Sequence, residues 1–278
     1  DTKRAAKYAN IELVELLKEP LAATFCYGYK TNEELTSKKS SDILIYDFGG
    51  GTLDVSYVEV IGNQFNVLAT AGDSNIGGQD FTNSIYEYIK PQLDELCNPE
   101  WQNQSKFVNK VKKNCEDAKI KLSSTRKYEL VIDIPNSIAK EPDSVFERII
   151  TRQEFEQLTQ GLFDKCMEPV EEVLCNVKRD PHVIESLVLV GGSSYLPKIL
   201  EKLYELTGKN AYHGVSAVDA VTFGACVIGG KYIQQKLIKS NQKSTQFDDK
   251  DEYMLNMKVN DKCKEDCFVT STIGIVKY

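Results

Sequence analysis

One stretch, residues 43–60, constrains the fold more than any other because it reads as two strands joined by three consecutive glycines. Residues 43–46 are apolar without alternation, which is typical of a strand buried on both faces, and residues 53–60 alternate less cleanly. Glycine carries no Cβ, so residues 49–51 can adopt positive φ and bring successive backbone N–H groups close to an anion. The sequence therefore predicts a hairpin with an anion-accepting turn.

Two oxygen-bearing side chains border the glycine turn, Asp47 at the end of the first strand and Thr52 directly after the glycines. Oxygens of this kind suit a hydrated magnesium ion. A phosphate-accepting turn beside a cation site favours a nucleoside triphosphate as the ligand. The alternative is an ordinary hairpin whose glycines serve only the turn.

Composition excludes several classes of partner. The 278-residue chain is 41% hydrophobic, which is enough for a substantial core, and its net charge is −7 with scattered basic residues. Neither nucleic acid nor an anionic membrane is expected as a partner, because phosphate contact needs a concentrated basic face. No apolar run approaches the roughly eighteen residues of a membrane span. The first residues, DTKR, form neither a signal peptide nor an initiator methionine, so we expect a fragment.

The chain contains eight cysteines, and none forms a CxxC pair. Most fall within apolar runs, so we expect them to be small buried hydrophobic residues. The closest pair, Cys263 and Cys267, is far in sequence from His182 and His213, which disfavours a structural zinc site. This usage favours a reducing, cytosol-like compartment.

Periodicity and turn signals predict alternating helices and strands over most of the chain. The expected helices cover residues 2–9, 20–26, 81–89, 104–122, 151–166, 169–177, a segment after 197, and 219–226. The expected strands, besides the hairpin, cover residues 65–71, 128–132, 145–150, 184–190 and two weak segments near the end. Residues 11–17 fit either a helix or a strand, residues 30–41 a surface loop, and residues 240–252 a linker.

Two further glycine segments lead into helices. Residues 72–78 open a helix whose N-terminus can hold an anion, although a simple connector is the alternative. The buried strand at 184–190 runs into a Gly-Gly-Ser turn and then a helix, which is a junction typical of nucleotide-binding folds.

The helix expected at 104–122 has two distinct faces. Its apolar face carries Phe107, Val111, Cys115, Ala118 and Leu122. A second face carries Glu116, Lys119 and Ser123, which are spaced by three and four residues. The default interpretation of such a charged stripe is a solvated surface.

Taken together, these segments resemble the seventy-kilodalton heat-shock chaperone (Hsp70) family, within the actin-like and hexokinase-like ATPases. The resemblance covers roughly residues 2–230. The matching segments are EP at 19–20, DFGGGTLDVS at 47–56, AGDSNIGGQDF at 71–81, EDAKIKLSS at 116–124, ITRQEF at 150–155, VLVGGSSYLP at 188–197 and DAVTFGA at 219–225. GGGT and GGS are shared with other actin-like ATPases, whereas GDSNIGGQDF, EDAKIKLSS and ITRQEF are more particular to the chaperones.

The resemblance implies an α/β chain with the actin-like ATPase (ribonuclease H-like) fold, and specifically its second lobe, in which a mixed sheet flanked by helices carries an inserted α+β subdomain. We expect this lobe to span residues 1–236, with its core at about 20–77 and 151–236 and the insert at about 78–150. Residues 237–278 would form a linker and, at most, the start of a following β domain. A first lobe with its own phosphate loop and catalytic lysine would lie outside this chain, so we expect the chain alone to be inactive.

The resemblance also implies roles around ATP or ADP and magnesium. Asp47 would orient the magnesium ion through water, and Glu19 would help place the attacking water or form the lobe contact. Phosphate contacts would come from Gly49, Gly50, Gly51 and Thr52. Ribose and adenine would be surrounded by Gly78, Glu116, Lys119, Ser123, Gly191, Gly192 and Ser193. Hydrolysis would then depend on positioning and charge neutralisation.

Three positions depart from the family pattern. Ile120 and Tyr195 replace two arginines that clamp adenine in typical members, and Val218 replaces an aspartate. Isoleucine offers apolar contact without guanidinium stacking, whereas tyrosine can still stack, so a re-shaped base pocket is expected.

Two functional classes follow from the resemblance. The first is an ATP-dependent chaperone, with unfolded peptides as clients and a J-domain co-chaperone and a nucleotide exchange factor as partners. The second is an exchange-factor-like or regulatory relative that binds nucleotide with little hydrolysis. Asp47, Glu19 and the glycine turn favour the first class, and Ile120, Tyr195 and Val218 favour the second. A sugar or acetate kinase is disfavoured by the chaperone-specific segments.

Overall fold

The computed structural model describes residues 2–30, 40–62, 64–212, 214, 216–241, 258–261 and 272–277. Its main sheet contains five strands in the order β7-β2-β3-β4-β8. The strands are β2 (Ser41–Phe48), β3 (Leu53–Ile61), β4 (Gln64–Asp73), β7 (Ser186–Val190) and β8 (Lys258–Asp261). β2, β3 and β4 pair antiparallel, whereas β7 runs parallel to β2 and β8 parallel to β4. The sheet is therefore mixed, as predicted.

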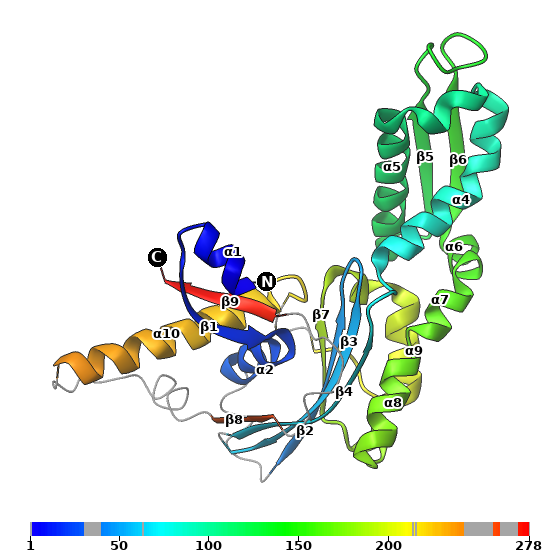
Figure 1. Ribbon diagram of the computed structural model, residues 1–278. Helices are drawn as coiled ribbons and strands as arrows, with labels where there is room; N and C mark the ends of the chain where they lie inside the picture. Colours follow the sequence, from blue (N-terminus) through cyan, green and yellow to red (C-terminus); the bar gives the residue numbers. More distant parts are fainter. Residues whose placement is uncertain are drawn as a thin grey trace.

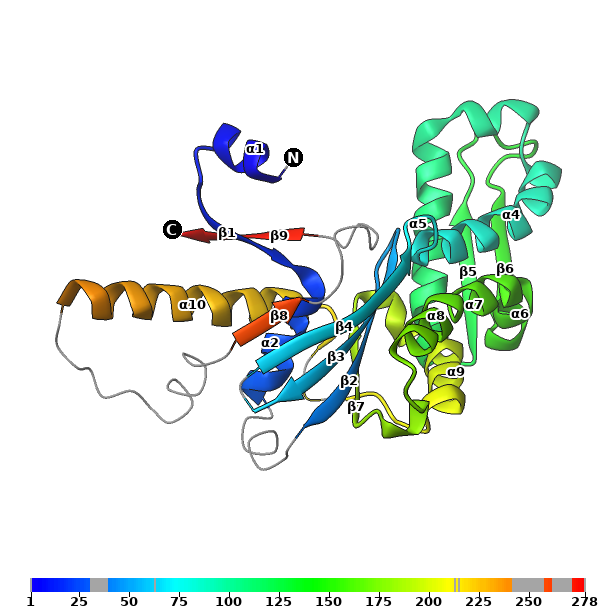
Figure 2. The same ribbon diagram turned by 60° about the horizontal axis from the view of Figure 1, so that its bottom comes forward.

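Helices cover both faces of this sheet (Figures 1 and 2). One face packs against α2 (Glu19–Lys30) and α10 (Ala220–Asn241), and the other against α8 (Glu168–Val177) and α9 (Pro197–Thr207). Along β2, Leu44 and Tyr46 enter the larger core, while Ile43 and Ile45 enter the core beneath α2. This strand is buried on both faces, which confirms the prediction from its continuous apolar run.

A second unit stands at one end of the main sheet (Figure 1). It consists of α4 (Gly78–Leu96), the 3₁₀ turn η1 (Pro99–Asn103), α5 (Ser105–Ser124), and an antiparallel pair, β5 (Lys127–Asp133) with β6 (Val145–Thr151). Its only tryptophan, Trp101, is fully buried against Phe107, with ring centroids 5.9 Å apart. The apolar face predicted for α5 is buried throughout.

The remaining elements settle one open alternative and correct one expectation. The N-terminal segment forms α1 (Thr2–Tyr8) and β1 (Glu12–Lys18), and β1 pairs antiparallel with β9 (Thr272–Lys277), so residues 11–17 contribute a strand. The single helix expected at 151–166 is wrong, because α6 (Arg152–Leu158) and α7 (Gln160–Lys165) are separate. The buried Thr159 between them donates its hydroxyl to the Phe155 carbonyl at 2.7 Å. The Thr159 amide donates to the same carbonyl at 3.1 Å, so the last turn of α6 stays hydrogen-bonded where the helix ends.

The capping box predicted at the start of α6 is confirmed. Thr151 Oγ1 accepts a hydrogen bond from the Glu154 amide at 3.1 Å, and Glu154 Oε2 accepts one from the Thr151 amide at 3.2 Å. Short 3₁₀ turns η2 (Pro181–Val183) and η3 (Gly192–Tyr195) flank β7. The loop at 30–41 and the linker at 240–252 fall largely outside the described residues.

The cysteines follow the expectation only in part. Cys26, Cys97, Cys115 and Cys166 are buried, and burial raises the pKa of the Cys115 and Cys166 thiols to about 12. Cys175 and Cys226 are exposed, because they lie on the outer faces of α8 and α10. Cys263 and Cys267 lie outside the described residues.

Two absences bear on the sequence-based expectations. Within the described part of the chain, no three His, Cys, Asp or Glu side chains form a group that could hold a metal ion. Among the helices that the structure describes, none is both long and apolar enough to cross a membrane.

Helices α2 and α10 touch along their backbones. A Cβ added at Gly224 on α10 would lie 1.8 Å from the Ala22 carbonyl oxygen on α2. Small residues allow this approach, as the composition of residues 219–226 predicts. The contact fixes α10 against the helix that begins at Glu19.

We expect Gly224→Ala to lower the free energy of unfolding by about 1–3 kcal/mol, because the added methyl group forces the two helices apart. Denaturant titration measures this difference. Gly230→Ala is the matched control, since a Cβ there meets nothing within 4 Å and alanine favours the helix, so stability should rise by up to about 1 kcal/mol. Equal effects at the two positions would show that the helices do not touch at Gly224.

Candidate functional site

Three carboxylates gather where β2 ends. Asp47 lies directly opposite Asp54 in the hairpin register, and Glu19, the first residue of α2, lies close enough to raise the pKa of the Asp47 side chain. Burial is the main cause that raises the pKa of Asp47 to about 7, followed by the charges of Glu19 and Asp54. Burial and then the Glu19 charge raise the pKa of Asp54 to about 6. These three residues form the carboxylate cluster.

Asp54 was not among the residues predicted for the site. A signal for it exists in the sequence, because a four-residue turn between β2 and β3 places residue 54 opposite residue 47. Two carboxylates on directly opposed strand positions repel each other, and such an arrangement persists when a positive charge binds beside it.

The glycine turn after Asp47 is closed by a hydrogen bond from the Gly49 amide to the Thr52 carbonyl at 3.0 Å. None of its three glycines has a positive φ, so the backbone itself does not require glycine at residues 49–51. A Cβ added at Gly50 or Gly51 would meet nothing within 4 Å. The absence of side chains instead leaves open space beside the turn, in which a ligand can approach the backbone.

The start of α4 is bonded to this same turn. The Gly78 amide donates to the Gly49 carbonyl at 3.0 Å, and the Gln79 amide donates to the Gly50 carbonyl at 2.8 Å. These amides are therefore not offered to an anion, and the geometry favours the connector interpretation of residues 72–78. Glycine is needed for the close approach, because a Cβ at Gly77 would lie 2.4 Å from the Gly50 carbonyl oxygen.

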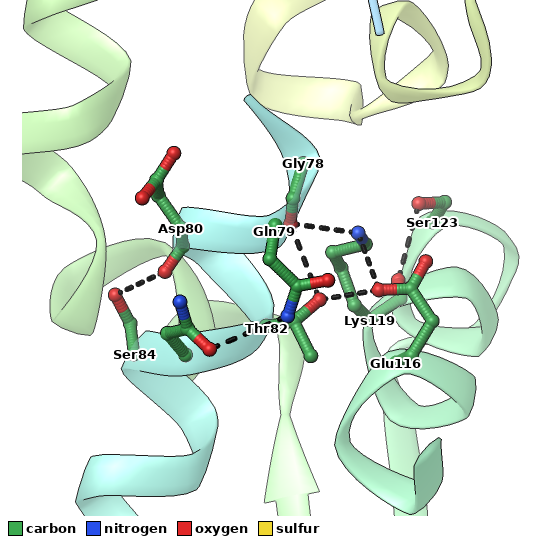
Figure 3. A network of polar contacts seen from close by, with 9 residues as sticks. Gly78, Gln79, Asp80, Thr82, Ser84, Glu116, Lys119 and Ser123 are labelled. Carbon is green, nitrogen blue, oxygen red and sulfur yellow. Dashed lines mark hydrogen bonds and ion pairs between the residues drawn. The ribbon is translucent and has the colours of Figure 1, made fainter. Parts of the chain in front are cut away.

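Lys119 on α5 points toward the start of α4 (Figure 3). Its Nζ donates to the Gly78 carbonyl at 2.8 Å and to Glu116 Oε2 at 2.7 Å, and the side chain of Thr82 also donates to Glu116. Lys119 is only 6% exposed. Lys119 on the charged stripe of α5 is thus not solvated, because the start of α4 covers it, whereas Glu116 and Ser123 stay partly exposed.

A pocket of about 550 Å³ opens between α5, η3 and the glycine turn. It brings together these predicted residues: Gly50, Glu116, Lys119, Ile120, Ser123, Gly192, Ser193 and Tyr195. The pocket is also lined by Gln79, Ser124 and Leu196, which were not predicted. Each of them directly follows a predicted residue in the sequence.

The other predicted residues do not line this pocket. Glu19 and Asp47 belong to the carboxylate cluster, and Gly49, Gly51 and Thr52 lie in the turn. Gly78 and Gly191 allow close packing, because neighbouring atoms occupy the place of a side chain. A Cβ at Gly78 would lie 2.2 Å from Ser193 Oγ, and one at Gly191 would lie 2.3 Å from the Phe48 carbonyl oxygen. Gly191 also has a φ of +78°, which a larger residue would adopt only with strain.

Aromatic and apolar side chains form one end of the pocket. Ile120 is 55% exposed and Tyr195 is 38% exposed, so both offer surface to a planar ligand. The Tyr195 hydroxyl accepts a hydrogen bond from the Ala217 amide at 2.8 Å, which fixes the ring from behind. Val218, next in the chain, is 66% exposed and does not line the pocket.

The five-stranded mixed sheet, with glycine turns at adjoining ends of β2 and β7, is that of the actin-like ATPase fold. A family model described as Hsp70 protein matches residues 1–258. The chain belongs to the Hsp70 family, which confirms the family and the fold class that the sequence segments predict.

Two curated relatives are named chaperone protein dnaK. The protein from Cyanidioschyzon merolae (strain NIES-3377 / 10D) is 32% identical over 229 residues, which cover 82% of this chain and 37% of the relative. The protein from Phaeodactylum tricornutum (strain CCAP 1055/1) is 34% identical over 229 residues, which cover 82% of this chain and 36% of the relative. The chain thus spans a little over a third of the length of these relatives.

The carboxylate cluster makes stability depend on pH. Asp47 and Asp54 have folded-state pKa values above the ordinary 3.8, so the folded state binds more protons and the free energy of unfolding decreases as the pH rises from about 4 to 7. We expect Asp47→Asn to be more stable than the parent above pH 7, by an amount on the order of 1–3 kcal/mol, and to lose this advantage near pH 4.

Thermal unfolding of both proteins at pH 4.5 and pH 8 checks this expectation. Glu129→Gln, which neutralises an exposed carboxylate on β5, is the control and should show no gain that grows with pH. A constant difference between Asp47→Asn and the parent at both pH values would contradict burial of an ionised cluster.

Proposed function

We propose that this chain is the ATP-binding second lobe of an Hsp70-type chaperone, whose full-length form couples ATP hydrolysis to the binding and release of unfolded peptides. The observation that carries this proposal is the pocket of about 550 Å³, because residues from four separate segments line it, one of them the glycine turn that follows Asp47. Its volume falls within the roughly 300–1,000 Å³ of small-molecule sites.

The pocket residues fit the parts of a nucleoside di- or triphosphate. The turn formed by residues 49–52 suits the phosphates, because Gly50 and Gly51 leave open space beside its backbone. Glu116, Lys119 and Ser123, which also line the pocket, offer acceptors and a donor to ribose hydroxyls. Ile120 and Tyr195 offer apolar and aromatic surface to the base.

The carboxylate cluster fits a magnesium ion that is held through water. Burial and then neighbouring negative charge raise the pKa values of Asp47 and Asp54, and a nearby cation would lower them. No group of three ligating side chains in the described ranges is close enough to bind an ion directly, which favours contact through the ion's water shell. Magnesium, when bound with nucleotide, supplies positive charge to the phosphates.

In this proposal the chain's own groups act by positioning. Asp47, once ionised, would help hold the magnesium ion through its water shell, and Glu19, which lies close to Asp47, would orient the attacking water. Thr52 adds a hydroxyl at the phosphates. A first lobe would complete the site with a second phosphate loop and a lysine, so this chain alone should not turn over ATP.

The expected partners of the full-length protein are unfolded peptide clients, a J-domain co-chaperone and a nucleotide exchange factor. Nucleic acid and membranes are not expected, given the net charge of −7. The cysteine content fits a reducing, cytoplasm-like compartment.

A second function remains in view, namely an exchange-factor-like or regulatory relative that binds nucleotide with little hydrolysis. The specific observation in its favour is the base end of the pocket, where Ile120 and Tyr195 stand in place of two arginines. The two functions differ in turnover rather than in binding.

We expect Asp47→Asn, in the protein that carries both lobes, to lower kcat by at least about 100-fold while nucleotide affinity changes far less, because the residue orients water and not the base. Steady-state turnover and calorimetry with ADP measure the two quantities. Asp133→Asn, an exposed carboxylate change on β5, is the control. Equal losses of turnover and affinity would show that Asp47 is structural, and an inactive parent would favour the regulatory alternative.

We expect Tyr195→Ala to weaken ADP binding by about 1–2 kcal/mol, the scale of a lost aromatic stack. Ile120→Arg should strengthen it by about 0.5–2 kcal/mol through guanidinium stacking on the base. Calorimetry beside Tyr204→Ala and Val131→Arg, matched exposed changes on α9 and β5, separates these effects from general ones. If neither variant departs from its control, the base does not lie between these side chains.

A further inference from the structure

Tyr195 contributes both to the pocket and to the turn that precedes α10. Its ring lines the pocket, and its hydroxyl accepts the Ala217 amide hydrogen bond at 2.8 Å. A side chain that carries only donors, such as that of arginine, could not make this bond. The link to Ala217 is therefore a property of this chain's tyrosine.

Both backbone polar groups of Ala217 are hydrogen-bonded. While its amide donates to Tyr195, its carbonyl accepts from the Gly191 amide at 2.9 Å. Ala217 is only 2% exposed, so water does not readily replace either bond. The turn that contains Ala217 is thus fixed to the Gly-Gly-Ser turn at both ends of η3.

This turn leads directly into α10. The amides of Asp219 and Ala220 both donate to the Ser216 carbonyl at 3.0 Å, which starts the helix. Along α10, Gly224 touches the backbone of Ala22, and the α2 helix that contains Ala22 begins at Glu19. A continuous series of contacts therefore joins the base end of the pocket to the carboxylate cluster.

We propose that Tyr195 is a positioning residue that couples the base end of the pocket to α10 through its hydrogen bond with Ala217. A base stacked on the ring restricts its rotation and keeps the hydroxyl against the Ala217 amide. By linkage, whatever strengthens that bond also strengthens base binding. This proposal rests on the proposed nucleotide-binding function and adds to it a route by which occupancy reaches Glu19.

The hydrogen bond itself is tested first, without nucleotide. Tyr195→Phe keeps the ring and removes the acceptor, so exchange of the Ala217 amide, measured residue by residue by NMR, should be about 3- to 10-fold faster than in the parent. Tyr204→Phe on α9 is the matched control and should leave Ala217 unchanged. Unaltered Ala217 exchange in Tyr195→Phe would overturn the proposal.

The coupling is tested next with saturating ADP on the protein that carries both lobes. In the parent, ADP should slow exchange of the Ala217 and Ala220 amides by about 5-fold or more. It should also slow Gln79, whose amide is bonded to the glycine turn. In Tyr195→Phe, the slowing at Gln79 should persist and that at Ala217 and Ala220 should disappear.

The remaining outcomes separate the two claims. Slowing at Gln79 but not at Ala217 in the parent would overturn the coupling and leave the nucleotide site in place. Equal slowing of Ala217 in Tyr195→Phe and the parent would show that the hydroxyl carries no coupling. No slowing anywhere, and no heat of ADP binding, would overturn the proposed function and the coupling together.

Discussion

The site depends on the parallel pairing of β2 with β7. Parallel strands bring their carboxyl ends to one edge of a sheet, and the register that pairs Asp47 with Val190 makes two glycine turns emerge side by side. The approach is so close that Gly191 leaves no space for a Cβ beside the Phe48 carbonyl. The turn after β2 then receives the start of α4, which in turn holds Lys119.

The same arrangement buries carboxylates at the end of β2, which does not favour folding. Asp47 and Asp54 are buried beside the half-buried Glu19, and this burial raises the pKa of both aspartates, so their ionisation is unfavourable. Native proteins tolerate such local conflicts mainly at functional sites, where a ligand relieves them. Lys119, by contrast, is satisfied within the chain by Glu116 and the Gly78 carbonyl, so it organises the pocket without needing a ligand.

Sequence patterns predicted most of the fold because burial was continuous where strands lie between two layers of helices, as at residues 43–46. They failed in three places. The regular apolar spacing over residues 151–166 does not show where α6 ends and α7 begins, and α4 covers Lys119, which lies on a stripe of α5 that spacing alone describes as solvated. Likewise, Asp54 joins the candidate site only through strand register, which a list of motifs does not contain.

The glycines around the pocket are of two physical kinds. At Gly78 and Gly191 the surrounding atoms occupy the place of a side chain, whereas at Gly50 and Gly51 that place is empty. Larger residues at the first pair would damage folding and ligand binding together, and any study of them would confuse the two. Substitutions at the second pair leave packing intact, so selection that acts on Gly50 and Gly51 reports on what the turn holds rather than on how the chain folds.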